Sequence, residues 1–117
     1  MTLDAATAAA RADRSWDDDI VSVLHDYIRI PNVSVAYDAT WDEAGHMAQA
    51  TDLLRDWCQR HVDEHLEGAK VEVQHIDGRT PLLIVDVPPA GEGAADDTVL
   101  LYGHLDKQPP FSGWRPG

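Results

Sequence analysis

Four consecutive residues near the end of the chain, Gly103-His104-Leu105-Asp106, combine a metal-ligating side chain with a carboxylate. They follow the apolar run 98–102, and ligand clefts of α/β proteins commonly lie where strands of the sheet end. A neutral imidazole is a good zinc ligand, and a nearby carboxylate can fix the tautomer of that imidazole. The spacing predicts a metal-binding His104 supported by Asp106. Taken alone, the tetrapeptide fits better a turn in which both side chains satisfy backbone groups.

The wider segment 99–109, VLLYGHLDKQP, resembles the first metal motif of the dimetal aminoacylase, carboxypeptidase and carnosine-dipeptidase metallopeptidases. In that family a helix ending near an Ile-Pro pair precedes a longer helix, a hairpin and then the motif strand. The same order is expected in this chain, with Ile30-Pro31 closing the first helix. The resemblance covers about residues 15–117 and favours metal binding by His104 over the simple turn.

This resemblance implies a metal-dependent hydrolase that cleaves an amide or peptide bond in a peptide or an N-acylated amino acid. His104 would ligate one of two metal ions, usually Zn2+, and Asp106 would support that histidine without being a ligand. Mn2+ or Co2+ would also suit a histidine ligand. Paired metals lower the pKa of a bridging water and polarise the carbonyl oxygen. A homodimer is compatible with the complete enzyme.

The remaining parts of such a site would lie outside this sequence. In the family the general-base glutamate, the metal-bridging aspartate and the other ligands follow the motif, which places them beyond residue 117. A catalytic zinc needs about three protein ligands. We therefore expect residues 15–117 to be the N-terminal portion of a catalytic domain, truncated at its C-terminus and inactive alone.

Two helices are expected ahead of the motif. Ser15 can cap the first helix, which should end before Pro31. Thr40 and Glu43 have the spacing of a capping box at the start of a longer helix, for which Gly68 is the natural stop. Its buried stripe is expected to comprise Met47, Ala50, Leu54, Trp57, Cys58 and Val62. Residues 1–14 are expected to form a flexible N-terminus.

Three strands should follow the helices and complete an α/β fold with a mixed sheet. Residues 71–74 alternate between apolar and polar, and residues 82–87 are nearly all apolar, which predicts a hairpin with a second strand covered on both faces. Residues 98–102 are expected to form the third strand, which leads into the motif.

Composition excludes several classes of partner. The chain has 9 basic and 21 acidic residues, and a net charge of -12 repels nucleic acid and anionic membrane surfaces. A single cysteine, Cys58, cannot form an internal disulfide, and no apolar run has the length of a membrane span or a signal peptide. These features favour a cytoplasmic protein.

Two alternative functions stay open. His61, Glu64 and His65 spell H-x-x-E-H, the zinc motif of inverted-zincin-type metalloproteases, although helix C-termini favour histidines for electrostatic reasons alone. The chain could instead be a non-catalytic acidic binding module. Its apolar strands argue against the module, because two helices would not cover both faces of such a sheet.

Overall fold

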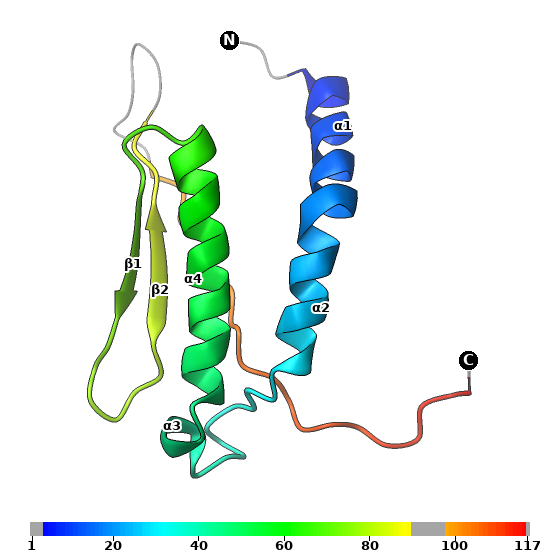
Figure 1. Ribbon diagram of the computed structural model, residues 1–117, viewed down its shortest axis with the longest axis vertical. Coiled ribbons are helices and arrows are strands. Elements are labelled where there is room, and N and C mark those ends of the chain that lie inside the picture. Colours follow the sequence, from blue (N-terminus) through cyan, green and yellow to red (C-terminus); the bar gives the residue numbers. More distant parts are fainter. Residues whose placement is uncertain (1–3, 90–97, 117) are drawn as a thin grey trace. The chain divides into compact units, whose positions relative to one another are not determined.

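The computed structural model describes residues 4–89 and 98–116, which belong to two compact units, Met1–Pro31 and Asn32–Gly117. The chain contains both helices and strands and is therefore a mixed α and β protein (Figure 1). No helix in these two stretches is long and apolar enough to cross a membrane.

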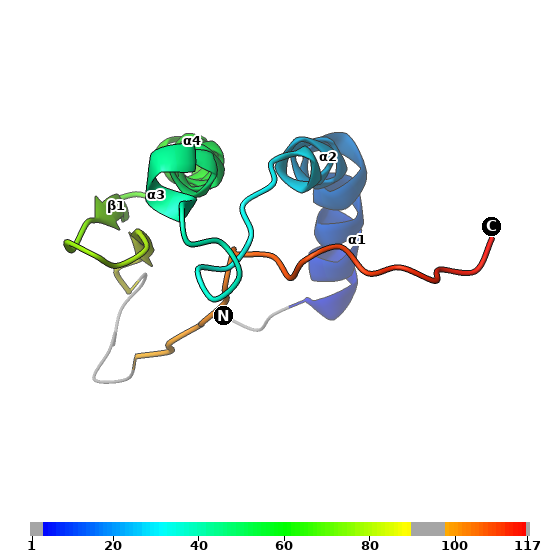
Figure 2. The same cartoon turned by 90° about the horizontal axis from the view of Figure 1, so that it is seen from below.

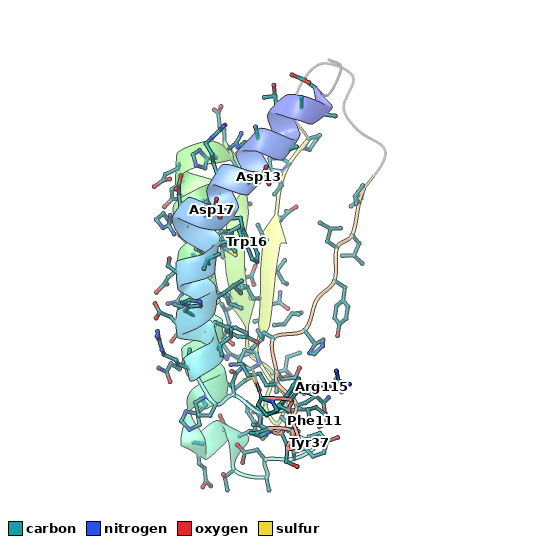
Figure 3. All side chains as sticks on the ribbon, turned by 90° about the vertical axis from the view of Figure 1, so that its right-hand side faces the viewer. Asp13, Trp16, Asp17, Tyr37, Phe111 and Arg115 are labelled. Carbon is teal, nitrogen blue, oxygen red and sulfur yellow. The ribbon has the colours of Figure 1, made fainter. Side chains whose placement is uncertain are left out.

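The first unit is one helical run. It comprises α1 (Ala5–Ser15), a π-helical turn η1 (Trp16–Ile20) and α2 (Val21–Arg29). Asp13, Trp16 and Asp17 follow one another along this run (Figure 3). In the π-helical turn the N–H of Val21 donates to the carbonyl of Trp16, five residues earlier, so the helix is locally widened and continues through the turn.

The predicted helix start at Ser15 is wrong, because the helix begins at Ala5. Asp4 caps it, accepting a hydrogen bond of 3.1 Å from the N–H of Ala6, and the alanine-rich residues that follow have the highest helix propensity. Ser15 has helical torsions (φ -62°, ψ -36°) and makes no side-chain capping bond. The predicted end is confirmed, since α2 stops at Arg29 and Ile30 is extended ahead of the proline.

The second unit opens with a loop and two helices, α3 (Trp41–Ala44) and α4 (His46–His65). The single long helix predicted from Thr40 is therefore interrupted. Gly45 adopts a left-handed φ of 73° between the two helices, a conformation that ends a helix and that glycine accepts at little cost. The capping box does not form, because the Thr40 hydroxyl donates to Asp38 Oδ1 at 2.9 Å and makes no bond to the helix.

The predicted hairpin is confirmed. Strands β1 (Lys70–Gln74) and β2 (Leu82–Asp86) pair antiparallel, with Val71 opposite Val85 and Val73 opposite Leu83. Helix α4 lies along the hairpin in both views (Figures 1 and 2). Half of its predicted apolar stripe is buried, namely Met47, Ala50 and Val62, whereas Leu54, Trp57 and Cys58 are half-buried. Leu82 and Val85 stay 53% and 42% exposed, so β2 lacks the predicted cover on both faces.

The predicted third strand is not formed. Residues 98–102 have no strand pairing in the described part of the chain, and the side chains of Val99 and Leu100 are 83% and 89% exposed. An extended apolar segment becomes a strand only when a neighbouring strand takes up its backbone N–H and C=O groups. Neither β1 nor β2 pairs with this segment. Within residues 4–89 and 98–116 the sheet therefore has two strands where three were predicted.

Candidate metal-binding site

The structure brings together the two residues that the motif singles out. Nδ1 of His104 lies 2.9 Å from Oδ1 of Asp106 and 3.1 Å from the backbone oxygen of the same residue. Both oxygens are acceptors when the carboxyl is ionised, so we assign the imidazole proton to Nδ1. Nε2 then carries a free lone pair, which is the state in which a histidine binds a metal ion. The His104 side chain is 67% exposed.

Asp106 is held as a carboxylate. A hydrogen bond from the Ser34 side chain lowers the pKa of Asp106, and the hydrogen bond with His104 lowers it further. Partial burial acts in the opposite direction, because desolvation disfavours the charged form. The Asp106 side chain is 32% exposed, roughly half as much as that of His104. The carboxylate therefore faces the protein, whereas the imidazole that it orients faces outward.

The Asn32 side chain forms hydrogen bonds with the residues on either side of Asp106, namely with the backbone of Leu105 and the side chain of Lys107. The asparagine is fully enclosed, with 1% of the residue exposed. Nδ2 donates to the carbonyl of Leu105 at 2.7 Å, and Oδ1 accepts from the ammonium group of Lys107 at 2.6 Å. Burial lowers the pKa of Lys107, and the Asn32 oxygen compensates part of the hydration that its ammonium group loses.

Backbone hydrogen bonds join the same two segments. The N–H of Lys107 donates to the carbonyl of Asn32 at 2.9 Å, and the N–H of Ser34 donates to the carbonyl of Lys107 at 2.8 Å. These bonds form an isolated parallel bridge between Val33 and Lys107. The loop at 32–34 is thus part of the site. Its alternation of Asn32 and Ser34 with Val33 and Val35 is a signal for an extended segment with two different faces.

A pocket opens beside the motif. It has a volume of about 570 Å³ and is lined by residues 102–106 together with Val35, Met47, Leu54 and residues 80–83 of the hairpin. This is the size of a small-molecule site. Tyr37 and Phe111, labelled in Figure 3, come from the loop and from the segment beyond the motif, and they are 62% and 69% exposed. The structure thus places the His104 imidazole at a mainly apolar pocket.

The described residues place one candidate metal ligand, His104. The contact between Nδ1 of His104 and Asp106 is the arrangement in which a carboxylate supports a histidine ligand, and in it the carboxylate is not itself a ligand. Across residues 4–89 and 98–116, no three His, Cys, Asp or Glu side chains are grouped so that they could hold an ion. The residues present fit a metal ligand set in part and do not complete one.

The rival motif on α4 has a different environment. The ring centroids of Trp57 and His61 lie 4.1 Å apart, and those of His61 and His65 lie 5.7 Å apart. Nε2 of His65 lies 3.5 Å from a carboxylate oxygen of Glu64. The three rings form a tilted stack along the last turns of the helix, and the glutamate contacts the neighbouring histidine. Beside them, burial raises the pKa of the Cys58 thiol, as expected for a packing residue.

No protein-family model matches the chain, and no significant match was found among the curated proteins compared with it.

Proposed function

We propose that this chain carries the first metal-binding arm of a metal-dependent hydrolase acting on peptide or related amide bonds. The observation that carries the proposal is the contact of 2.9 Å between His104 Nδ1 and Asp106 Oδ1, beside a pocket of about 570 Å³. A carboxylate that holds Nδ1–H leaves Nε2 available as a ligand. The likeness of residues 99–109 to the first motif of the dimetal metallopeptidases supports the same proposal.

In this proposal the chain supplies binding and orientation. His104 contributes one ligand, Asp106 fixes its ring, and the pocket receives a peptide or an N-acylated amino acid. A bound pair of metal ions, Zn2+ or alternatively Mn2+ or Co2+, would polarise the amide carbonyl and activate water. One histidine cannot hold a catalytic metal, so the proposal requires further ligands and a general base in addition to His104 and Asp106.

The exposed apolar segment 98–102 supports the proposal that this sheet takes up further strands. Leu101 and Tyr102 are 88% and 87% exposed, and stable domains rarely leave four consecutive apolar side chains in water. We propose that residues 98–102 become an inner strand of a mixed α/β sheet when further strands are supplied. A self-sufficient binding module would not need this segment in an exposed state.

Activity measurements on two proteins test the proposal. The 117-residue chain and the longest reading frame that contains it are loaded with Zn2+, Mn2+ or Co2+ and assayed on dipeptides and N-acyl amino acids. We expect the longer protein to hydrolyse these substrates and the 117-residue chain not to do so. In the longer protein, His104→Ala should lose both the hydrolysis and the bound metal. His75→Ala, at an exposed histidine after β1, is the matched control and should retain both. Full activity and metal content in His104→Ala would overturn the proposal.

A further inference from the structure

Residues of the hairpin turn and of α3, which lie at the same end of α4, line a pocket that we call the Arg79 pocket (Figure 1). It has a volume of about 410 Å³, within the range of about 300 to 1,000 Å³ for small-molecule sites. Four apolar side chains and one cation define its chemistry, namely Val35, Trp41, Ile76, Leu82 and Arg79. All of these residues belong to the second unit.

The apolar walls of the Arg79 pocket are open to water. Val35 and Ile76 are 45% and 59% exposed, and Leu82 is 53% exposed. These three side chains come from the loop before α3, from the hairpin turn and from the start of β2, and they line one cavity. Single exposed apolar side chains are common on protein surfaces, whereas a group of them around a pocket marks a place for an apolar ligand. The Arg79 pocket therefore suits a ligand with an apolar body.

The charge of Arg79 has no partner in the described part of the chain. Its side chain forms no salt bridge or hydrogen bond within residues 4–89 and 98–116, and its backbone N–H donates to the carbonyl of Ile76 at 2.9 Å. Arg29 and Arg55, by contrast, pair with nearby aspartates at 3.0 and 2.6 Å. A guanidinium group presents a planar fork of N–H donors that matches the two oxygens of a carboxylate. Arg79 is thus available to bind an anion from solution.

The surroundings of Arg79 favour a single negative charge. An adjoining pocket, which shares Trp41 and Arg79 with the first, is also lined by Asp42 and Asp77, and their carboxylates repel an anion there. Among the described residues that line the Arg79 pocket, Arg79 is the only charged one, and the hydroxyl of the next residue, Thr80, offers a further donor. One guanidinium group in a chain of net charge -12 matches a carboxylate better than a dianion such as phosphate.

The Arg79 pocket adjoins the pocket beside the motif, because Val35, Thr80 and Leu82 line both of them. The cation of the first pocket and the imidazole of His104 at the second are therefore placed on either side of a common wall. An N-acyl amino acid and a peptide C-terminus each combine a free carboxylate, a side chain and a neighbouring amide. This order of groups matches the order of the two pockets.

We propose that the Arg79 pocket binds the free carboxylate and the apolar side chain of an N-acyl amino acid or of a peptide C-terminus, with Arg79 as the anion-binding residue. Trp41, half-buried at the start of α3, is one wall of the pocket for the apolar side chain. The binding itself is a property of the metal-free chain. Its role as part of a substrate site for hydrolysis rests on the proposed function.

The test is a titration of the 117-residue chain with N-acetyl-L-leucine at neutral pH without metal, followed by the indole N–H resonance of Trp41. N-acetyl-L-leucinamide lacks the charge, and N-acetylglycine lacks the apolar side chain. Arg79→Gln removes the guanidinium group at an exposed turn position. Lys70→Gln is the matched control, since it removes one positive charge at the open end of the same hairpin, opposite Asp86. Circular dichroism checks that both variants keep the fold.

We expect N-acetyl-L-leucine to shift the Trp41 resonance to saturation in the wild type and in Lys70→Gln, with equal dissociation constants. The constant should rise about tenfold in Arg79→Gln, the loss expected for a hydrogen bond to a charged group. In the wild type, N-acetyl-L-leucinamide should bind about tenfold more weakly for the same reason. N-acetylglycine should also bind about tenfold more weakly, because it buries no leucine side chain.

Several results would overturn the inference. Equal binding of N-acetyl-L-leucine and its amide would show that the carboxylate is not recognised, and equal losses in Arg79→Gln and Lys70→Gln would point to net charge. Inorganic phosphate that shifts the Trp41 resonance at a lower concentration than N-acetyl-L-leucine would indicate a general anion site. Binding at the Arg79 pocket with no hydrolysis by the longer protein supports the inference and overturns the proposed function. Hydrolysis by the longer protein, without such binding in the metal-free chain, does the reverse.

Discussion

The ammonium group of Lys107 lies 2.6 Å from Oδ1 of Asn32, a residue 75 positions earlier in the chain. The other end of the same amide holds the carbonyl of Leu105 at 2.7 Å. The two bonds bracket Asp106, so the carboxylate that orients His104 is placed from both sides by one buried side chain. A substitution of Asn32 is therefore expected to change the position of the His104 imidazole.

The first prediction concerns this amide. Asn32→Leu should lower the free energy of unfolding by about 2 to 4 kcal/mol, because the Leu105 carbonyl and the Lys107 ammonium group lose their part-buried hydrogen bonds to the Asn32 amide. Urea unfolding followed by circular dichroism measures the loss. Gln74→Leu, at an exposed strand position where the side chain bonds Glu72, is the control and should change stability by less than about 0.5 kcal/mol. Equal losses in both variants would contradict the role of Asn32.

The second prediction concerns the carboxylate. Asp106→Asn replaces an ionised acceptor with a neutral one, so His104 Nδ1–H is held less strongly. The dissociation constant for zinc, read from the His104 resonances during a titration, should rise about 10- to 100-fold. Asp77→Asn, in the exposed turn of the hairpin, removes the same charge elsewhere and should leave zinc binding unchanged. A similar loss in both variants would point to net charge as the cause.

The third prediction compares two glycines with left-handed backbones. Gly45 has a φ of 73° and nothing within 4 Å of an added Cβ, so Gly45→Ala should cost only the backbone term of about 1 to 2 kcal/mol. Gly68 has a φ of 77°, and an added Cβ would lie 3.3 Å from Cγ of Pro88. Gly68→Ala should therefore be the more destabilising of the two. Thermal unfolding of both variants measures the order, and the reverse order would contradict it.

The fourth prediction concerns pH. Burial raises the pKa of the Cys58 thiol, so the folded chain retains the thiol proton at a pH where the unfolded chain has lost it. The associated stability is complete below the ordinary thiol pKa and declines as the pH rises through the higher pKa of the folded state. Iodoacetamide should react more slowly with folded chain than with chain in denaturant at the same pH. Cys58→Ala should remove this part of the pH dependence, and identical alkylation rates would contradict the raised pKa.

Local signals in the sequence predict the parts of the fold that depend on neighbours along the chain. The end of α2 before Pro31 follows from the steric restriction on the residue ahead of a proline, and the hairpin follows from alternation and turn residues. Ser15 is misleading as a helix start, because the stronger cap, Asp4, lies upstream of an alanine-rich segment. The break at Gly45 is hidden in the sequence, since the capping box at Thr40 suggests one continuous helix.

Only the local half of the site follows from the sequence. His104 and Asp106 are two residues apart, so one short motif is enough to predict their contact. Asn32 and Ser34 form hydrogen bonds with the motif segment, more than 70 residues later in the chain. No periodicity in the sequence predicts a contact between these two segments. The prediction of a third strand is wrong for a related reason. The apolar residues 98–102 suit a strand, but a strand forms only where another strand pairs with its backbone, and the sequence of the segment does not show whether such a strand is present.

The bridge between Val33 and Lys107 also has a consequence for the time course of folding. Asn32 and Lys107 are 75 residues apart in the chain. Closing a loop of this length costs about 4 kcal/mol in chain entropy, and contacts at the site offset this cost only after the loop has closed. The hairpin and α4 need only short closures and can form in microseconds. The imidazole and its supports should therefore assemble in a late kinetic phase, after the elements between them are in place.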